Sequence, residues 1–457
     1  MKPTLQIIIL GCSKNRVDVE HLLPCIEEVY DILPEGADPL GEGDGRVDTV
    51  LLDTCGFIGD AKEESITAIL AQAQRKKEGL VGRIVVMGCL SQRYASELPS
   101  LIPEVDAWFG ARELVPVINY LGGSAPEGEL PTRRTRTQGR GSYAYMKISE
   151  GCDRRCSYCA IPLIRGPHRS VPVQTLVKEA RELASRGVRE LILIAQDTTF
   201  YGLDLYRRRA LGTLLQALCE VPGIEWIRIH YSYPQDFPED VLDIMASSPK
   251  ICRYMDIPLQ HVSDRVLANM HRGVDGKWTR ELIGKMRERV PGIVLRTTMI
   301  VGHPGEGPSE FKELLSFVEE ARFERLGAFT YSEEEGTFGQ KNFKDSIRPS
   351  TKERRLSALM REQSGISFAY NLSRVGKTIS VLVDDILPSD GILVCRSEFE
   401  SPEVDGEVLV NYDPLKSGGL SLEEMPGHFL EVEVSEADEY DLRARMIGML
   451  DAPRREL

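Results

Sequence analysis

A unit of one strand followed by one helix repeats about six times between residues 141 and 332. Each strand is a short aliphatic run, and a helical pattern follows it before the next run begins. The expected strands are 143–148, 190–195, 225–230, 254–258, 293–301 and 326–331. Strands that alternate with helices form parallel sheets. The repeat therefore predicts a partial (β/α)6 barrel within residues 141–370, with reactive loops at the carboxyl ends of its strands.

The regions on either side of this repeat predict two further domains. Residues 1–124 also alternate strands with helices, and their aliphatic runs are typical of a small parallel α/β domain. Residues 125–140 are rich in Pro, Gly, Thr and Arg and indicate a linker. Short strands between Gly, Pro and Asp over residues 371–442 predict a small all-β barrel, followed by a tail at 443–457. The expected fold class is α/β plus small all-β.

Charge and hydropathy restrict the partners of this chain. Its net charge of −14 disfavours general binding to nucleic acids. No apolar run approaches the roughly 18 residues of a membrane span, and the first residues turn polar too soon for a secretory signal. We therefore expect a cytoplasmic protein whose ten cysteines stay reduced, as metal ligands or core residues. Four linker arginines could touch phosphates, although solvated charge is the simpler interpretation: Arg133, Arg134, Arg136 and Arg140.

Three cysteines directly follow the first strand of the repeat at the spacing C-x3-C-x2-C: Cys152, Cys156 and Cys159. Barrel enzymes keep their reactive groups in such loops. Thiolates hold iron–sulfur clusters, and because a cubane takes four ligands, three cysteines leave one iron open to a substrate. The alternative is a structural zinc site, for which His168 is the nearest candidate as fourth ligand.

This spacing, with Tyr158 before the last cysteine, resembles the radical S-adenosylmethionine (SAM) superfamily. The resemblance implies that the open iron chelates the amino and carboxylate groups of SAM. One electron from the cluster then splits SAM to methionine and a 5′-deoxyadenosyl radical, while the protein orients and shields the cofactor. The three cysteines are then the implied catalytic centre, and Tyr158 is an implied cofactor contact.

Further polar residues near the expected strand ends are candidates for contacts with SAM. Arg296 lies on the fifth strand and is expected to pair with the cofactor carboxylate. Gly302 and Glu306 belong to a segment that resembles the superfamily's glycine-rich turn, where the backbone approaches the cofactor; an ordinary strand-to-helix turn is the alternative. Two pairs are expected at the same rim, after the second and fourth strands: Gln196 with Asp197, and Gln260 with His261.

Three more cysteines stand just beyond the three expected N-terminal strands: Cys12, Cys55 and Cys89. The carboxyl ends of parallel strands share one edge of a sheet, where such sheets bind ligands. The thiols should therefore converge without any local motif and hold a second cluster with an open iron. The alternative is three buried cysteines that act as small hydrophobic residues. Four others show no such placing and are expected in the core: Cys25, Cys219, Cys252 and Cys395.

Two clusters in this order, followed by a small β-barrel, resemble the radical SAM methylthiotransferase family along essentially the whole chain. The resemblance implies an N-terminal domain with an auxiliary cluster, a radical SAM core and a TRAM domain. It also implies two 4Fe–4S clusters and two SAM molecules per turnover. One SAM methylates sulfur at the N-terminal cluster, and the other supplies the radical that removes a substrate hydrogen. Electron donor and sulfur donor proteins are the implied partners.

Two branches of this family differ in their substrate, tRNA adenosine or the β-carbon of an aspartate in a small-subunit ribosomal protein. Segments 195–202, 329–337 and 396–399 resemble the ribosomal-protein (RimO-like) branch. Residues 371–457 carry 8 Lys and Arg against 19 Asp and Glu, a net charge of −11 that would repel tRNA and attract a basic protein. Two residues depart from the usual proline and phenylalanine of this branch: Ser13 and His303.

The sequence therefore predicts an enzyme that adds a methylthio group to an aspartate of a small-subunit ribosomal protein, with no membrane partner. A tRNA adenosine methylthiotransferase is the first alternative. A non-enzymatic iron–sulfur scaffold is the second, and it would form no 5′-deoxyadenosine from SAM.

Overall fold

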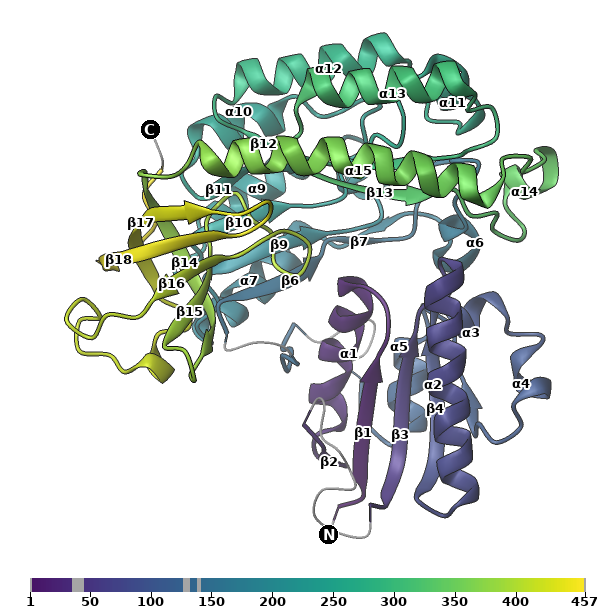
Figure 1. Ribbon diagram of the computed structural model, residues 1–457. Coiled ribbons are helices and arrows are strands. Elements are labelled where there is room, and N and C mark those ends of the chain that lie inside the picture. Colours follow the sequence, from purple (N-terminus) through teal and green to yellow (C-terminus); the bar gives the residue numbers. More distant parts are fainter. Residues whose placement is uncertain (1, 35–44, 126–131, 138–140, 456–457) are drawn as a thin grey trace.

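The computed structural model describes residues 2–34, 45–125, 132–137 and 141–455. It consists of an N-terminal sheet with helices, a central partial barrel and a small closed β-barrel at the C-terminal end (Figure 1). The partial barrel, whose sheet has six strands, is called the half-barrel below. None of the helices in the described ranges is both long and apolar enough to cross a lipid bilayer.

The N-terminal domain is built on five parallel strands in the order β2-β1-β3-β4-β5. Helix α2 packs on one face of this sheet, and α1 and α5 pack on the other. Both faces are therefore buried, which explains the unbroken aliphatic runs of the central strands. The elements are β1 (Thr4–Ile9), α1 (Ser13–Ile26), β2 (Asp31–Ile32), β3 (Val47–Thr54), α2 (Gly59–Lys77), β4 (Val81–Gly88), α3 (Cys89–Arg93), α4 (Leu98–Leu101), β5 (Ala107–Trp108) and α5 (Leu114–Tyr120).

The central domain holds six parallel strands in the order β13-β12-β11-β10-β9-β6. The end strands β6 and β13 are not neighbours in this sheet, so it forms the expected partial barrel rather than a closed one. The strands are β6 (Tyr143–Lys147), β9 (Glu190–Ile194), β10 (Trp226–Ile229), β11 (Ile251–Asp256), β12 (Val294–Val301) and β13 (Arg325–Thr330).

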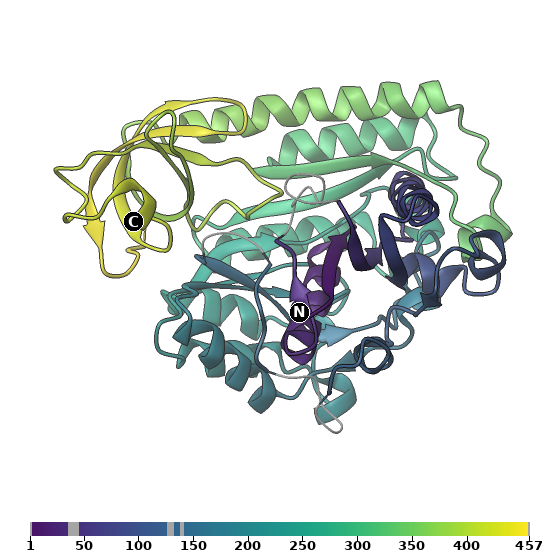
Figure 2. The ribbon, with the colours of Figure 1, turned by 90° about the horizontal axis from the view of Figure 1, so that it is seen from below.

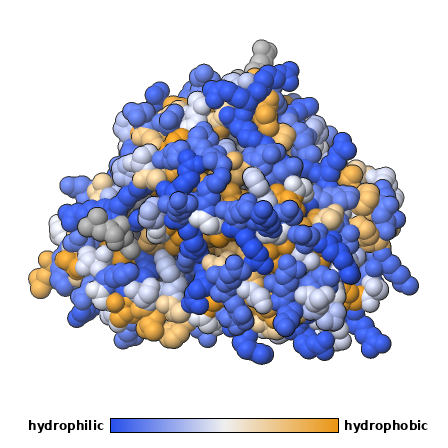
Figure 3. Space-filling view, turned by 90° about the horizontal axis from the view of Figure 1, so that it is seen from above, coloured by the Kyte–Doolittle hydropathy of each residue, from blue (hydrophilic) through white to orange (hydrophobic). Residues whose placement is uncertain are grey.

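Helices cover the outer face of this half-barrel and bury its largest apolar core. Seen from above, the helical side is largely hydrophilic, with hydrophobic residues scattered among polar ones (Figure 3). The long helices are α7 (Val173–Ser185), α9 (Leu211–Cys219), α10 (Asp240–Ser247), α12 (Gly276–Arg289), α13 (Pro308–Ala321) and α15 (Pro349–Leu372). The short elements are β7 (Ser149–Glu150), α6 (Ile161–Arg165), β8 (Arg169–Ser170), η1 (Thr198–Phe200), α8 (Leu203–Tyr206), α11 (Asp264–Asn269) and α14 (Phe338–Asn342).

The C-terminal domain is a closed barrel of five strands in the order β14-β15-β16-β18-β17. The expected domain end at residue 442 is corrected by the structure, because β18 occupies the first part of the expected tail and closes the barrel against β16 and β17. Leu442, Ala444 and Met446 of this strand are buried between exposed arginines, a period of two that marks a strand. The elements are β14 (Thr378–Leu387), β15 (Ile392–Arg396), β16 (Val408–Asn411), η2 (Leu422–Glu424), β17 (Phe429–Ala437) and β18 (Leu442–Leu450).

The two neighbouring domains contact different parts of the half-barrel. The C-terminal barrel packs against the amino ends of the strands, where Trp226 and Val294 meet Phe399 and Phe429. The N-terminal domain packs α1 against β6 and α3 against α6, near the loop that follows the first strand (Figures 1 and 2). The N-terminal sheet therefore adjoins the cysteine loop of the half-barrel, while the C-terminal barrel lies at the opposite ends of the strands.

Candidate metal centres

The cysteine loop of the half-barrel lies between β7 and α6, and backbone hydrogen bonds hold it. Gly151, with φ of +80°, opens the loop; a Cβ there would lie 2.2 Å from the carbonyl oxygen of Pro167. The Cys152 N–H donates to the carbonyl of Gly166 (3.0 Å), and the Ser157 N–H donates to that of Met270 (3.0 Å). The loop therefore presents its three thiols on a backbone anchored from separate parts of the barrel.

The thiols of this loop lie close enough to influence one another. Burial raises the pKa of Cys159, and the neighbouring thiols of Cys156 and Cys152 raise it further. Burial also raises the pKa of Cys152 to about 12. These two cysteines keep their protons at neutral pH until a metal replaces the proton, as metal binding to thiols requires.

A buried arginine from a distant segment contacts this loop and was not predicted from the sequence. Arg272 Nη1 lies 3.4 Å from Cys156 Sγ and 3.3 Å from Tyr158 Oη, and its Nη2 donates to the carbonyl of Pro258. Its guanidinium also lies 4.1 Å from the ring centre of Tyr233, whose hydroxyl is 3.5 Å from Cys156 Sγ. No motif marks Arg272, because only the folding of α11 beside the loop brings it there.

The N-terminal cysteines lie on three neighbouring segments that follow β1, β3 and β4. Cys12 precedes α1, Cys55 follows β3, and Cys89 begins α3 directly after β4. A Cβ placed on Gly11 would lie 3.1 Å from Cys55 Cβ, and one on Gly56 would lie 2.8 Å from the backbone of Cys89. Burial raises the pKa of Cys89 to about 12, although the guanidinium of Arg165 opposes this shift.

The donor set of each cysteine trio is three thiols. Within the described ranges, no three or more Cys, His, Asp or Glu side chains form a group that could hold one metal ion. His168, the candidate fourth ligand of a zinc site, instead places its Nε2 3.0 Å from Ser170 Oγ and 3.9 Å from Asp204. Three thiols are the number of protein ligands that leaves one iron of a cubane open.

Two of the expected cofactor contacts take part in polar chains beside the cysteine loop. Gln196 donates its side-chain amide to Glu150 (2.7 Å), and its carbonyl oxygen is buried without a partner. Asp197 pairs with Arg154 of the loop (2.8 Å). A buried acceptor without a partner is costly unless a ligand or water satisfies it, so Gln196 is suited to receive a donor.

The glycine-rich turn after β12 is closed by its own residues. The Gly302 N–H, at φ of +80°, donates to Glu306 Oε2 (2.8 Å). The other oxygen of Glu306 accepts from Arg355 (2.7 Å), and His261 Nε2 lies 3.4 Å from Oε2. Glu306 therefore braces the turn, and the side chain has little capacity left for a ligand.

The structure does not bring Arg296 to the cofactor side of the barrel. It is the third residue of β12, near the amino end, and it forms ion pairs with Asp256 (3.1 Å) and Asp405 (3.5 Å). Asp405 belongs to the segment that joins β15 to β16 of the C-terminal barrel. The expected pairing of Arg296 with a cofactor carboxylate is corrected, because residence on a strand does not place a residue at its carboxyl end.

The linker arginines that the structure describes have structural partners. Arg134 is buried and forms ion pairs with Glu20 of α1 and Glu179 of α7. Arg133 pairs with Glu27 (2.9 Å). Arg134 is neither a phosphate contact nor a solvated charge, because it joins two domains. Arg140 lies outside the described residues.

Family comparisons agree with this architecture. The Radical SAM superfamily matches residues 146–318, the TRAM domain matches 375–447, and the Uncharacterized protein family UPF0004 matches 4–110. The radical SAM methyltransferase TsrM from Kitasatospora setae shares the fold at a TM-score of 0.53, with 14% identity over 72% of this chain and 73% of TsrM. The fold and the cysteine loop define a radical SAM enzyme with a TRAM domain, a class that uses a 4Fe–4S cluster and SAM.

Curated relatives match the chain along its whole length. Two proteins named ribosomal protein uS12 methylthiotransferase RimO are 48% identical to it. The match covers 98% of this chain and 100% of the Bacteroides fragilis protein, and 97% and 99% for Porphyromonas gingivalis. A third, from Cytophaga hutchinsonii, is 45% identical over 98% of both chains. The chain belongs to the RimO family of radical SAM methylthiotransferases.

Proposed function

We propose that this enzyme adds a methylthio group to the β-carbon of an aspartate in ribosomal protein uS12. The names of the full-length relatives support the substrate. One contact supports the proposal that two cysteine-bound centres lie near each other. The Nε of Arg165 lies 3.2 Å from the Sγ of Cys89, and Arg165 follows Cys159 by six residues. Helix α6, which follows the cysteine loop of the half-barrel, therefore contacts Cys89 across the boundary between the domains.

In this proposal each trio of cysteines holds one 4Fe–4S cluster: Cys12, Cys55 and Cys89 in the N-terminal domain, and Cys152, Cys156 and Cys159 in the half-barrel. When bound, the clusters and two SAM molecules per turnover supply the substrate radical and the methylated sulfur. Gln196 offers its free acceptor to the cofactor, Tyr158 belongs to the cysteine loop itself, and the backbone at Gly302 forms the turn that Glu306 braces. In this proposal, partner proteins supply the electrons and the sulfur. Because the substrate is a ribosomal protein, the enzyme acts in the cytoplasm.

The C-terminal barrel favours a basic protein over tRNA as the substrate. Residues 371–457 carry a net charge of −11. Many of these carboxylates are on the surface, and the exposed ones include Asp390, Glu403, Glu407, Glu423, Glu424, Glu436, Asp438 and Glu439. A surface that binds a phosphate backbone needs positive charge, because counterion release dominates binding to nucleic acids. The same surface attracts the Lys and Arg residues of a ribosomal protein.

The test is an anaerobic incubation of the full-length enzyme with SAM, a reductant and a sulfur source, and with either uS12 or tRNA. We expect a methylthio mass increase on the aspartate of uS12 and none on tRNA. A variant with Cys12, Cys55 and Cys89 changed to Ala should still form 5′-deoxyadenosine but add no methylthio group. Modification of tRNA alone would favour the first alternative function, and no 5′-deoxyadenosine from the intact enzyme would favour a scaffold.

A further inference from the structure

Arg165 of helix α6, which follows the cysteine loop of the half-barrel, contacts the N-terminal cysteine site. It is the last residue of α6 and is 2% exposed. Its Nε donates toward Cys89 Sγ at 3.2 Å. Its Nη1 contacts Asp18 (3.1 Å) and Glu150 (2.9 Å), and its Nη2 is 3.4 Å from the side-chain oxygen of Asn15. One guanidinium thus joins a cysteine and α1 of the N-terminal domain to β7 of the barrel.

The surrounding charges hold this guanidinium in place. Asp18 and Glu150 also pair with Lys147, so two cations and two carboxylates balance each other beside the cysteine. These ion pairs occupy Nη1, and Nε is directed at the sulfur. A thiol is a weak acceptor, whereas a thiolate bound to a metal carries negative charge and accepts a charge-assisted hydrogen bond. The geometry is therefore suited to the ligated form of Cys89.

We propose that Arg165 is a positioning residue that tunes the N-terminal centre. The proposal rests on the proposed function, because it requires a cluster on Cys12, Cys55 and Cys89. Hydrogen bonds to ligand sulfurs and nearby charge set the reduction potential of such clusters. A fixed positive charge beside Cys89 stabilises the more negative, reduced state. Since Arg165 belongs to α6 of the barrel, the docking of the barrel completes the surroundings of the N-terminal centre.

A purely structural ion pair is the competing explanation, and the chain contains a matched control for it. Arg134 is also buried, and it joins Glu20 of α1 to Glu179 of α7 across the same two domains. Its described hydrogen bonds reach carboxylates and the carbonyl oxygen of Tyr145, and none reaches a cysteine. Loss of Arg134 therefore weakens domain docking without removing a donor from a ligand sulfur.

The experiment uses the full chain with Cys152, Cys156 and Cys159 changed to Ala, so that only the N-terminal cluster can form. Its reduction potential is measured by a redox titration followed by electron paramagnetic resonance. We expect Arg165→Met to lower the potential, Arg165→Lys to lower it less, and Arg134→Met to leave it unchanged. Loss of iron in Arg165→Met with normal iron in Arg134→Met would also support the proposal.

An unchanged potential in Arg165→Met, or an equal shift in Arg134→Met, would overturn the proposal and leave the proposed function intact. If the chain with Cys152, Cys156 and Cys159 changed to Ala, the parent of these variants, binds no iron at all, the N-terminal cluster is refuted. The proposed function would then fail together with this inference. The iron content of the parent therefore separates the two failures.

Discussion

At the scale of single residues, His303 is buried beside the cysteine loop in an aromatic setting. Its Nδ1 donates to the carbonyl of Pro304 (3.0 Å), its Nε2 lies 3.4 Å from Ser157 Oγ, and its ring packs against Tyr331. Burial lowers the pKa of His303 to about 4. An unfolded histidine binds its proton near pH 6.5, so the unfolded state gains protons first as the pH falls. Folding stability therefore declines below about pH 6.5, by about 2 kcal/mol at pH 5 from this residue.

The substitution His303→Phe should remove this loss of stability. Phenylalanine keeps the ring contacts and cannot take up a proton, so the difference in unfolding free energy between pH 7.5 and pH 5 should shrink by about 2 kcal/mol. Urea unfolding at the two pH values measures the change, and the same substitution at the exposed His271 is the control. An unaltered pH dependence in His303→Phe would contradict the assignment of a neutral buried imidazole.

Arg272 is a second single residue whose replacement should lower the activity of the site formed by Cys152, Cys156 and Cys159. The substitution Arg272→Met removes the donor to the Pro258 carbonyl and the contacts with Cys156 and Tyr158. Substitutions in the shell around metal ligands commonly cost about 10–100-fold in activity or metal affinity. We expect a decrease of that size in 5′-deoxyadenosine formation, with the iron of the N-terminal site retained. If Arg272→Met forms 5′-deoxyadenosine at the wild-type rate, Arg272 has no role in this site.

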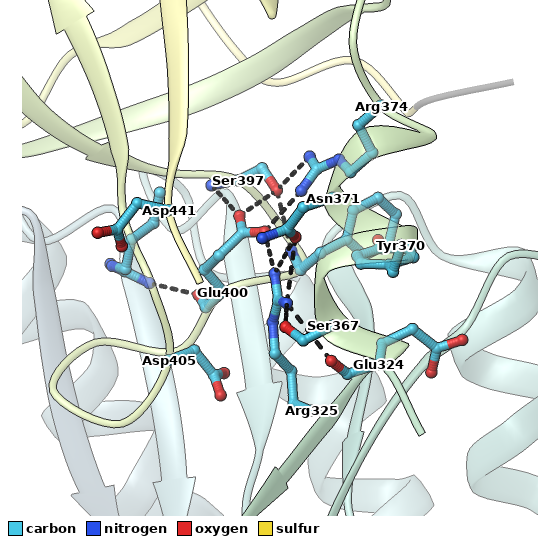
Figure 4. Close-up of polar contacts among 12 residues, drawn as sticks. Glu324, Arg325, Ser367, Tyr370, Asn371, Arg374, Ser397, Glu400, Asp405 and Asp441 are labelled. Carbon is cyan, nitrogen blue, oxygen red and sulfur yellow. Dashed lines mark hydrogen bonds and ion pairs between the residues drawn. The ribbon is translucent and has the colours of Figure 1, made fainter. Parts of the chain in front are cut away.

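At the scale of elements, a buried ion triad fastens the C-terminal barrel to the half-barrel. Glu400 lies between Arg325 of β13 and Arg374, which follows α15, at 3.2 Å and 2.6 Å (Figure 4). Its other oxygen accepts from the hydroxyl and the N–H of Ser397. Burial raises the pKa of Glu400, but Arg374 and Arg325 outweigh this effect and lower it to about 2. The carboxylate therefore stays charged and pairs with both guanidinium groups.

The substitution Glu400→Gln should destabilise this joint strongly, because it removes the buried negative charge that Arg325 and Arg374 share. Breaking a buried pair from one side costs about 3–5 kcal/mol. The exposed pair of Glu433 with Arg445 is the control, and Glu433→Gln should cost less than about 1 kcal/mol. Chemical unfolding of both variants checks the contrast. Equal and small losses would show that the triad is not required for docking.

Most strands could be predicted from the sequence, and long-range contacts could not. The strands β3 and β4 are buried on both faces, so their unbroken aliphatic runs are enough to predict them as strands. The placing of Cys12, Cys55 and Cys89 after strands indicated three cysteines at one edge of the sheet, and the structure brings the segments that carry them into contact. Arg165 and Arg272 could not be found, because their contacts depend on how distant segments dock.

At the scale of the whole molecule, buried ion pairs and apolar contacts join the three parts. Lys62 and Arg93 of the N-terminal domain both pair with the buried Glu334, in a segment beyond β13 (2.9 and 2.8 Å). At the other end, Trp226 and Tyr254 of the half-barrel share an apolar cluster with Phe399 and Phe429. The chain should therefore fold as one unit in which each domain covers a surface of the next.

Removal of the C-terminal barrel should consequently expose an apolar surface. We expect a chain that ends at residue 376 to bind a hydrophobic dye and to aggregate, because the cluster around Trp226 would face water. A chain that ends at residue 452 keeps this cluster and loses only the C-terminal segment, so it should stay monodisperse. Size-exclusion chromatography and dye fluorescence distinguish the two. A well-behaved, dye-free chain ending at 376 would show that the domains are independent.

The most direct test of two cysteine-bound centres is the iron and sulfide content of anaerobically purified protein. We predict about eight iron and eight sulfide per chain, and about four of each when either trio is changed to Ala, whether Cys12, Cys55 and Cys89 or Cys152, Cys156 and Cys159. Zinc in place of iron would contradict the account. Full iron content after loss of the N-terminal trio, or only about four iron in the unaltered chain, would contradict it equally.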